Sequence, residues 1–307
     1  MSHPPPPSVL AGFGLTGTPI PLSGGRGLCF RIANTVLRPC DDASESQYLS
    51  DLTKSLLALN PTSYRLAKPL PSVSDPSQFI ISSWTASSYL PGKPSLSHFT
   101  LLFHAVSAFH ADLATLVSVQ PPILDTRAAN RFTEADKVTW GEKPLSAVDK
   151  VNADMLSQLE PILSRLEAAM RPLPTEEEEP RLRKQLVHLD LLGNVLVDDS
   201  EEGENPPGII DLSLYWRPAV YAIAVVVADG LTRLEEDEKK KLVDLFFRRL
   251  GEVSVKREVG VELLLRALYW RYLTFAIDPD LEWIKVNLPE ADYEGAANTL
   301  CVLAVRP

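Results

Sequence analysis

The sequence predicts an α+β protein in which an antiparallel sheet of short strands comes first and a helical region follows. Three observations support this prediction. About the first ninety residues hold short apolar stretches separated by glycine, proline and asparagine, which is typical of strands joined by turns. From residue 95 onward, apolar residues recur at helical spacing. No segment is repeated, and 307 residues are enough for one large or two modest domains.

The N-terminal region is predicted to contain five strands and one helix. The strands are expected at residues 18–22, 28–33, 35–39, 63–70 and 78–83. A helix is expected at residues 43–59, and residues 84–91 are expected to connect the last strand to the helical region. The first eleven residues carry a run of four prolines and are expected to form a disordered tail. These boundaries predict a tail at 1–11, a sheet domain at 12–92 and a helical domain at 93–307.

The helical region is predicted to begin with a helix whose apolar residues recur every three to four positions. They are Phe99, Leu102, Phe103, Val106, Phe109 and Leu113. Further helices are expected at residues 147–170, 218–231, 235–250, 259–277 and 292–305. Two short apolar strands are expected on either side of a polar loop near residue 190. His104 and His110 lie six residues apart on the first helix, and therefore on different faces, so they are not expected to share a metal ion.

Composition and charge argue against several kinds of partner. The formal net charge is −10, and neither nucleic acid nor an anionic membrane is expected to bind, because both need clustered lysine and arginine. The same charge mildly favours a cationic or neutral small substrate. The N-terminus lacks the basic start and apolar core of a signal peptide, and the longest apolar run, 219–228, is too short to span a bilayer. Three scattered cysteines argue against a disulfide framework, so a cytoplasmic protein is expected.

The polar loop near residue 190 carries the strongest functional signal. In LVHLDLLGNVLV, His188, Asp190 and Asn194 lie between two apolar stretches, and Asp211 ends the next one, GIID. Phosphoryl transfer from a nucleotide needs a carboxylate that receives a hydroxyl proton and hard oxygen ligands for magnesium. Asp190 is therefore the candidate general base, and Asn194 and Asp211 are the candidate metal ligands. His188 is expected to be structural, tying the loop to the strand that carries Asp211. A polar turn is the alternative, since Asp, Gly and Asn all favour turns.

Two glycine-rich segments near the N-terminus differ in how strongly they indicate a nucleotide-binding site. GFGLTG, at residues 12–17, matches a dinucleotide-binding pattern, but no strand precedes it and Pro19 and Pro21 prevent a helix from following, so a flexible loop is expected. SGGRG lies between two predicted strands, where its backbone N–H groups could fold over phosphates or form an ordinary hairpin turn. The candidate phosphate-binding residues in this segment are Ser23, Gly24, Gly25, Arg26 and Gly27.

Arg38, in the predicted strand TVLRP, is the candidate cation for the nucleotide phosphates. A kinase fold normally has a lysine there, which reaches the phosphates and pairs with an acid on the next helix. Arginine keeps the charge but presents a planar fork. Glu45 and Asp51 are the two candidate partners, and an exposed strand arginine is the alternative. Trp216, in LSLYWRP, is expected on a loop that overhangs a substrate pocket.

These segments resemble a known family. HLDLLGNVLV followed by IIDLSLYWRPAVYAIAVVVAD is similar to the aminoglycoside phosphotransferase and choline kinase group, which has a two-lobed, protein-kinase-like fold. A little-characterised bacterial subfamily of that group resembles this chain in PLSGGRGLCFRIANTVLRP, WTASSYLPG, KVTWGE and HLDLLGNVLV. The resemblance covers residues 12–230. It implies ATP and Mg²⁺ as cofactors, Asp190 as the catalytic aspartate, His188 as the histidine of its HxD motif, Arg38 as the phosphate contact, and Asn194 and Asp211 as the magnesium ligands.

The resemblance also places the adenine near residues 83–87. The residues expected to contact it are Ser83, Trp84, Thr85 and Ala86. Three departures from the family pattern matter: Leu189 replaces a common glycine, the loop between Asp190 and Asn194 is one residue shorter than in most antibiotic kinases, and Arg38 replaces lysine.

The predicted activity is an ATP- and magnesium-dependent transfer of phosphate to the hydroxyl of a small molecule, with an amine-bearing acceptor weakly favoured by the acidic charge. The alternative is a catalytically weak nucleotide-binding or scaffold protein. The sequence leaves the acceptor, the choice between ATP and GTP and the oligomeric state open.

Overall fold

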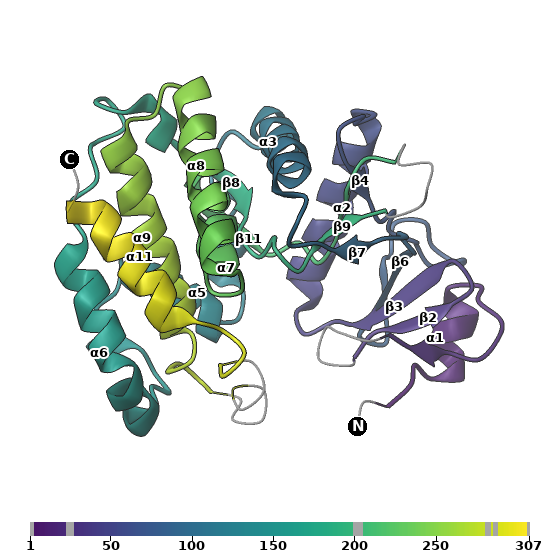
Figure 1. Cartoon of the computed structure of the whole chain (residues 1–307). Coiled ribbons are helices and arrows are strands. Elements are labelled where there is room, and N and C mark those ends of the chain that lie inside the picture. Colours follow the sequence, from purple (N-terminus) through teal and green to yellow (C-terminus); the bar gives the residue numbers. More distant parts are fainter. Residues whose placement is uncertain (1–2, 23–27, 199–204, 280–283, 285–287, 306–307) are drawn as a thin grey trace. The chain divides into compact units, whose positions relative to one another are not determined.

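The computed structural model describes residues 3–22, 28–198, 205–279, 284 and 288–305. The chain divides into two compact units (Figure 1). Unit 1 contains Met1–Ala128 and Gly193–Leu212, and unit 2 contains Ala129–Leu192 and Ser213–Pro307. The division therefore differs from the predicted boundary at residue 92, because two strands from the middle of the chain, at 195–197 and 208–209, pair with strands of the N-terminal region.

Unit 1 contains the predicted antiparallel sheet, which has five strands in the order β1-β2-β3-β6-β5. The strands are β1 (Ile20–Pro21), β2 (Phe30–Ile32), β3 (Thr35–Pro39), β5 (Ile80–Ile81) and β6 (Trp84–Ser88). β3 is the predicted strand 35–39, and its register with β6 runs from Thr35 opposite Ser88 to Pro39 opposite Trp84. The α+β fold class and the N-terminal antiparallel sheet are confirmed.

The predicted connector at 84–91 is wrong, because its first five residues form β6, which pairs with β3 on one side and β5 on the other. A two-residue turn precedes it, in which Ser82 and Ser83 have φ of 47° and 61°. Such turns join antiparallel strands most readily when both central residues have positive φ, a role usually taken by glycine or asparagine. Two serines gave no turn signal in the sequence.

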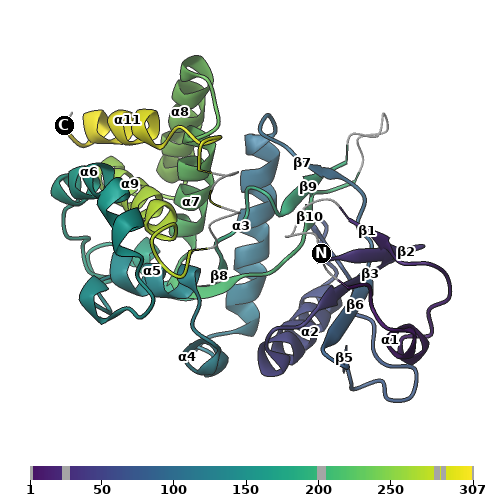
Figure 2. The same ribbon diagram turned by 90° about the horizontal axis from the view of Figure 1, so that it is seen from below.

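The predicted disordered tail is also wrong for the described residues of that segment. Residues Pro7–Gly12 form helix α1, with proline in its first turn, where a missing N–H costs nothing. Val9 is fully buried and packs with Phe13, Ile32 and Leu37 of the sheet region. Burial of these apolar side chains orders the segment, and Figure 2 shows α1 beside the sheet. Residues 13–19 form the predicted loop after α1.

A second sheet of unit 1 has the strand order β4-β10-β9-β7. Its strands are β4 (Arg65–Leu66), β7 (Lys93–Pro94), β9 (Val195–Val197) and β10 (Gly208–Ile209). The helices of the unit are α2 (Ala43–Ala58), α3 (Phe99–Leu116) and α4 (Ile123–Thr126) in addition to α1. The Asp42 side chain caps α2 by accepting the Glu45 N–H at 3.0 Å, which explains where this predicted helix begins.

Among the described residues, α3 alone is long and apolar enough to cross a membrane by length and composition. A core helix passes the same test, and the predicted apolar face of α3 is buried, including Leu102, Phe103 and Phe109. His110 is buried while His104 is exposed, as their spacing predicted.

Unit 2 combines a two-stranded antiparallel ribbon with a group of helices. The ribbon consists of β8 (Lys184–His188) and β11 (Leu214–Pro218). The helices are α5 (Arg131–Thr139), α6 (Ala153–Ala169), α7 (Ala219–Leu231), α8 (Glu236–Glu252), α9 (Arg257–Leu273) and α11 (Tyr293–Val305), with single 3₁₀ turns at Leu145–Ala147 and Pro180–Leu182. Figure 1 shows α6, α7, α9 and α11 packed side by side. All of these α-helices except α5 were predicted.

Two features of unit 2 differ from the sequence predictions. Trp216 was expected on a loop, but it lies in β11, opposite Leu186 of β8. Helix α5 was not predicted, although Asn130 and Thr133 form a capping box at its start, which is a recognisable helix signal. The helix is short and mostly polar, so it shows little of the apolar periodicity on which helix prediction depends.

Candidate active site

The polar loop that starts at Asp190 follows β8 directly, and β8 is attached to β11 where the loop begins. His188, the last residue of β8, is fully buried and its Nδ1 accepts the backbone N–H of Ser213 at 3.1 Å. The Leu189 N–H donates to the Ser213 carbonyl oxygen at 3.2 Å. Ser213 comes two residues after Asp211 in the chain. His188 therefore has the structural environment that was expected of it, next to the segment that follows Asp211.

Asp190, the candidate general base, is partly exposed and bound to a residue that the sequence did not indicate. Its side chain is 43% exposed, and Oδ1 accepts a hydrogen bond from Nη2 of Arg271 at 2.6 Å. Arg271 lies near the end of α9, and its side chain is only 11% exposed. The sequence does contain one signal for this contact. Arg271 lies next to Trp270 in a largely apolar helix, and a buried arginine rarely lacks an acidic partner.

Asp229, on α7, anchors the other side of Arg271. Nε of Arg271 donates to the two Asp229 oxygens at 2.8 and 3.1 Å, and Nη2 donates to Oδ2 at 2.7 Å. Burial raises the pKa of Asp229, and the guanidinium counteracts this by favouring the ionised form. Burial also disfavours the charged form of Arg271, but Asp229 and Asp190 outweigh it and raise the arginine pKa. The guanidinium therefore remains charged between two carboxylates.

The candidate metal ligands, Asn194 and Asp211, lie at the ends of two neighbouring strands in unit 1. Asn194 immediately precedes β9 and Asp211 follows β10 by one residue, and these strands are antiparallel neighbours. The Ile210 N–H donates to the backbone oxygen of Asn194 at 2.9 Å, so the pairing extends to the residue before Asp211. The Asp211 side chain is 48% exposed. An amide oxygen and a carboxylate from adjacent positions suit a hard cation.

Arg38, on β3, contacts the carboxylate of Asp211, with Nη1 donating to Oδ1. Neither of the two expected helix acids is its partner among the described residues. Glu45 forms an ion pair with Arg127 at 2.9 Å, and Asp51 accepts a hydrogen bond from the side chain of Gln47 at 3.0 Å. Arg38 and Asp211 are each about half exposed, so water screens this pair. The candidate phosphate cation and one candidate metal ligand therefore contact each other.

The remaining candidate nucleotide contacts lie in two segments of unit 1. The segment Ser23–Gly27 lies outside the described residues. Ser83 is in the turn before β6, and its carbonyl oxygen accepts the Cys40 N–H at 2.8 Å. Trp84 and Thr85 pair with β3 and β5 on both sides, and Ala86 is buried in the core around Val9. The backbone of Trp84 and Thr85 is thus occupied by sheet pairing on both sides.

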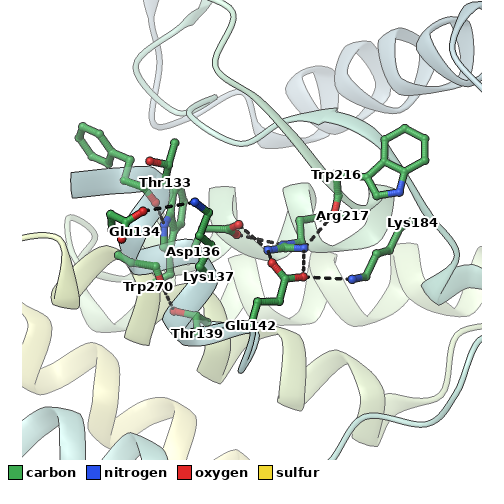
Figure 3. A network of polar contacts seen from close by, with 12 residues as sticks. Thr133, Glu134, Asp136, Lys137, Thr139, Glu142, Lys184, Trp216, Arg217 and Trp270 are labelled. Atoms are coloured by element: carbon green, nitrogen blue, oxygen red, sulfur yellow. Dashed lines mark hydrogen bonds and ion pairs between the residues drawn. The ribbon is translucent and has the colours of Figure 1, made fainter. Parts of the chain in front are cut away.

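The segment KVTWGE takes part in a polar network in unit 2 (Figure 3). Arg217 of β11 donates to Asp136 at 3.1 and 2.6 Å and to Glu142 at 2.8 Å through each of Nη1 and Nη2. Lys184 of β8 also binds Glu142, at 3.2 Å. Burial disfavours the charge on Arg217, but Asp136 and Glu142 outweigh it and raise its pKa. The network attaches the end of α5 to the β8–β11 ribbon, at the end of the ribbon away from His188.

The candidate site residues that the structure describes belong to different units. Unit 1 holds Arg38, Asn194 and Asp211, and unit 2 holds His188 and Asp190. Within the described part of the chain, no three His, Cys, Asp or Glu side chains form a cluster that could hold a metal ion. Any metal site would therefore depend on a small donor set such as Asn194 and Asp211, completed by a ligand or by water.

Comparisons with known proteins identify the fold. No family model matches the chain, and no curated protein matches its sequence. The structure is similar to an aminoglycoside phosphotransferase from Alicyclobacillus acidocaldarius subsp. acidocaldarius DSM 446, with 13% identity, a TM-score of 0.55, and coverage of 99% of this chain and 98% of the other. It is also similar to a microcompartment-associated aminopropanol kinase, with 14% identity, a TM-score of 0.59, and coverage of 97% and 92%. The predicted protein-kinase-like fold, as found in this group of phosphotransferases, is confirmed over nearly the whole chain.

Proposed function

We propose that this chain, which has the fold of small-molecule phosphotransferases, transfers the γ-phosphoryl group of ATP to a hydroxyl of a small molecule in a magnesium-dependent reaction. The observation that carries the proposal is the environment of Asp190. It is a partly exposed carboxylate held by Arg271 at the end of β8, only four residues before Asn194, which lies beside Asp211. A base and two oxygen ligands are the groups that this reaction requires of the protein.

In the proposed reaction one bond to the γ-phosphorus forms and one breaks. The hydroxyl oxygen of the acceptor forms a new bond to the γ-phosphorus, and the bond between that phosphorus and the β–γ bridging oxygen breaks with its electron pair left on ADP. The hydroxyl proton passes to the carboxylate of Asp190. Positioning and charge neutralisation supply most of the catalysis in such reactions, because the protein forms no covalent bond to the phosphoryl group.

The residues present fit a magnesium ion. Asn194 and Asp211 offer an amide and a carboxylate oxygen at adjacent positions, and the Asp211 side chain is 48% exposed. Magnesium keeps several waters and binds one or two protein oxygens together with nucleotide phosphates. When bound, the ion neutralises charge on the phosphate oxygens. Arg38 contacts the carboxylate of Asp211, and this contact supports its proposed role as a cation for the nucleotide phosphates.

We infer that the nucleotide base lies along residues 89–92 rather than 83–87. The sheet occupies β6 until Ser88, and Tyr89 donates its N–H to the Asn34 carbonyl oxygen at 2.8 Å. The following backbone leaves the sheet and reaches Gly92, which has φ of 128°. For the phosphates, the backbone N–H groups of Ser23–Gly27 remain the proposed contacts.

The acceptor is proposed to be an amino alcohol or another hydroxyl compound that carries an amine. The net charge of −10 mildly favours a cationic substrate, and one similar structure is that of an aminopropanol kinase. Cytoplasmic localisation and the absence of nucleic-acid and membrane partners are parts of the same proposal.

A second candidate function is a catalytically weak, nucleotide-binding scaffold. The contact between Arg38 and Asp211 favours it, because a guanidinium on a metal ligand competes with the metal. Replacement of Arg38 by lysine separates the two functions. In an enzyme adapted to arginine, Arg38→Lys leaves turnover unchanged or lowers it, whereas in a weakened enzyme it raises turnover.

Thermal shift with ATP or GTP, with and without magnesium, tests the proposed function in the wild type and in Asp211→Ala. A ligand at one hundred times its Kd stabilises the protein by about 2.7 kcal/mol, which is easily measured. We expect stabilisation that needs magnesium and disappears in Asp211→Ala. No shift with either nucleotide would contradict both candidate functions.

A further inference from the structure

Arg271 joins two aspartates that come from different elements of unit 2. Its Nε and Nη2 hold Asp229 of α7 through three contacts between 2.7 and 3.1 Å. The same Nη2 donates to Oδ1 of Asp190 at 2.6 Å. Asp229 is 14% exposed, while Asp190 is 43% exposed. The guanidinium is thus anchored at its buried side and holds the carboxylate that remains accessible.

The helix that carries Arg271 is attached to α5 by the residue before Arg271, and its last turn is closed by a local hydrogen bond after it. The indole N–H of Trp270, which is fully buried, donates to the Phe132 carbonyl oxygen at 2.9 Å. The Thr274 hydroxyl donates to the carbonyl oxygen of Arg271 at 2.6 Å. A side chain on such a framework has few alternative rotamers, and a group hydrogen-bonded to it is restrained in turn.

We propose that Arg271, anchored by Asp229, is a positioning residue that keeps Asp190 ionised and correctly oriented to receive the acceptor's hydroxyl proton. The inference rests on the proposed function. A carboxylate next to a guanidinium is favoured in its charged form. A misplacement of about 1 Å of a catalytic group costs about 10²-fold in rate, so a restraint on a half-exposed aspartate has a direct catalytic effect.

The charged and titratable groups around this bridge come from three helices and the segment after α7. Besides Arg271 of α9 and Asp229 of α7, they are Arg233, in the segment after α7, and Tyr293, the first residue of α11. Arg233 favours the ionised form of Asp229, as Arg271 does, while Tyr293 stays protonated because burial raises its pKa. Removal of Arg271 therefore leaves Asp229 and Asp190 with one charged neighbour fewer.

The test is a titration of the Asp190 carboxyl carbon by NMR in the ligand-free full-length protein, with the signal assigned by its loss in Asp190→Asn. In Arg271→Met we expect the Asp190 pKa to rise by about one unit or more. Arg271→Lys keeps the charge but loses the planar guanidinium that holds Asp229 through three contacts and Asp190 through a fourth, and we expect a smaller rise. This variant also serves if the methionine variant does not fold. The matched control is Arg217→Lys, which alters another buried arginine between two acids and leaves the Asp190 pKa unchanged.

Kinetics distinguish positioning from a purely structural role. The probe is hydrolysis of Mg·ATP with water as the acceptor. We expect Arg271→Lys to lower kcat about 10- to 100-fold with little change in the KM for ATP, because Asp190 orients the acceptor and not the nucleotide. Asp229→Asn keeps the Arg271 charge but weakens its anchor, so kcat falls while the Asp190 pKa does not rise. Arg217→Lys keeps the wild-type kcat.

Two results overturn the inference. One is an unchanged Asp190 pKa in both Arg271 variants, and the other is a wild-type kcat in these variants despite a raised pKa. Failure of the proposed function is recognised separately, because nucleotide binding is measured by thermal shift. If the wild type neither binds nor hydrolyses ATP, the proposed function fails and the catalytic role of Arg271 fails with it.

Discussion

Removal of the Arg217 guanidinium is expected to destabilise unit 2 strongly. In Arg217→Met the side-chain stem is kept, but Asp136, which is 6% exposed, loses hydrogen bonds of 3.1 and 2.6 Å. Removing one partner of a buried ion pair costs about 3–5 kcal/mol, because the remaining charge stays desolvated. Glu142 is 40% exposed and adds about 1 kcal/mol or less. The contact of the guanidinium with the Trp140 ring, at 5.0 Å, adds a similar amount.

The assay is thermal unfolding followed by circular dichroism, with the wild type and the variant at the same pH and salt. For a domain of about 150–250 residues, 1 kcal/mol corresponds to about 2–4 °C, so a total loss of about 3–7 kcal/mol lowers Tm by about 6–28 °C. Asp136→Asn in the Arg217→Met background removes the buried negative charge that Arg217 no longer neutralises and restores part of the loss. Lys184→Met, at the exposed edge of the same network, changes Tm by no more than about 2–4 °C. A drop of less than about 3 °C in Arg217→Met would refute the reasoning.

Three further predictions concern Gly92, Glu142 and Val9. Gly92→Ala lowers the free energy of unfolding by about 1–3 kcal/mol in urea titrations, because φ is +128° and the new Cβ would lie 2.8 Å from the Val197 carbonyl oxygen. The control is Gly193→Ala, whose Cβ meets nothing within 4 Å and which changes the free energy of unfolding by less than about 1 kcal/mol. Equal losses in the two variants would contradict this prediction. Glu142 has a lowered pKa, because its arginine and lysine partners outweigh the effect of burial. Its ion pairs therefore stabilise the protein fully above the unfolded-state pKa of about 4.3, and this stabilisation is lost as the pH falls through the lower pKa of the folded state. Below about pH 4.3, the Tm of Glu142→Gln should fall less steeply with pH than the Tm of the wild type. Parallel curves of Tm against pH would disprove this prediction. Val9→Ala lowers the free energy of unfolding by about 1–3 kcal/mol if α1 belongs to the core, whereas an unchanged urea midpoint would support a disordered tail.

Local periodicity in the sequence was enough to predict several helices and one strand. Strand β3 and helices α2, α3, α7 and α11 lie within a few residues of their predicted positions, because their apolar spacing and end signals involve neighbours along the chain. The loop with Asp190 and Asn194 was also evident, since it combines chemically distinctive residues with turn-forming ones between two apolar strands.

Contacts between distant side chains could not be predicted from the sequence and became visible in the folded structure. Arg38 contacts Asp211, 173 positions away, rather than an acid on the next helix, and Asp190 is held by Arg271, 81 positions away. The strand at Trp84–Ser88 and the order of α1 likewise depend on partners in the sheet and the core. Such contacts are stabilised by burial and by charge pairing between segments that are distant along the chain, and local propensity contains no information about them.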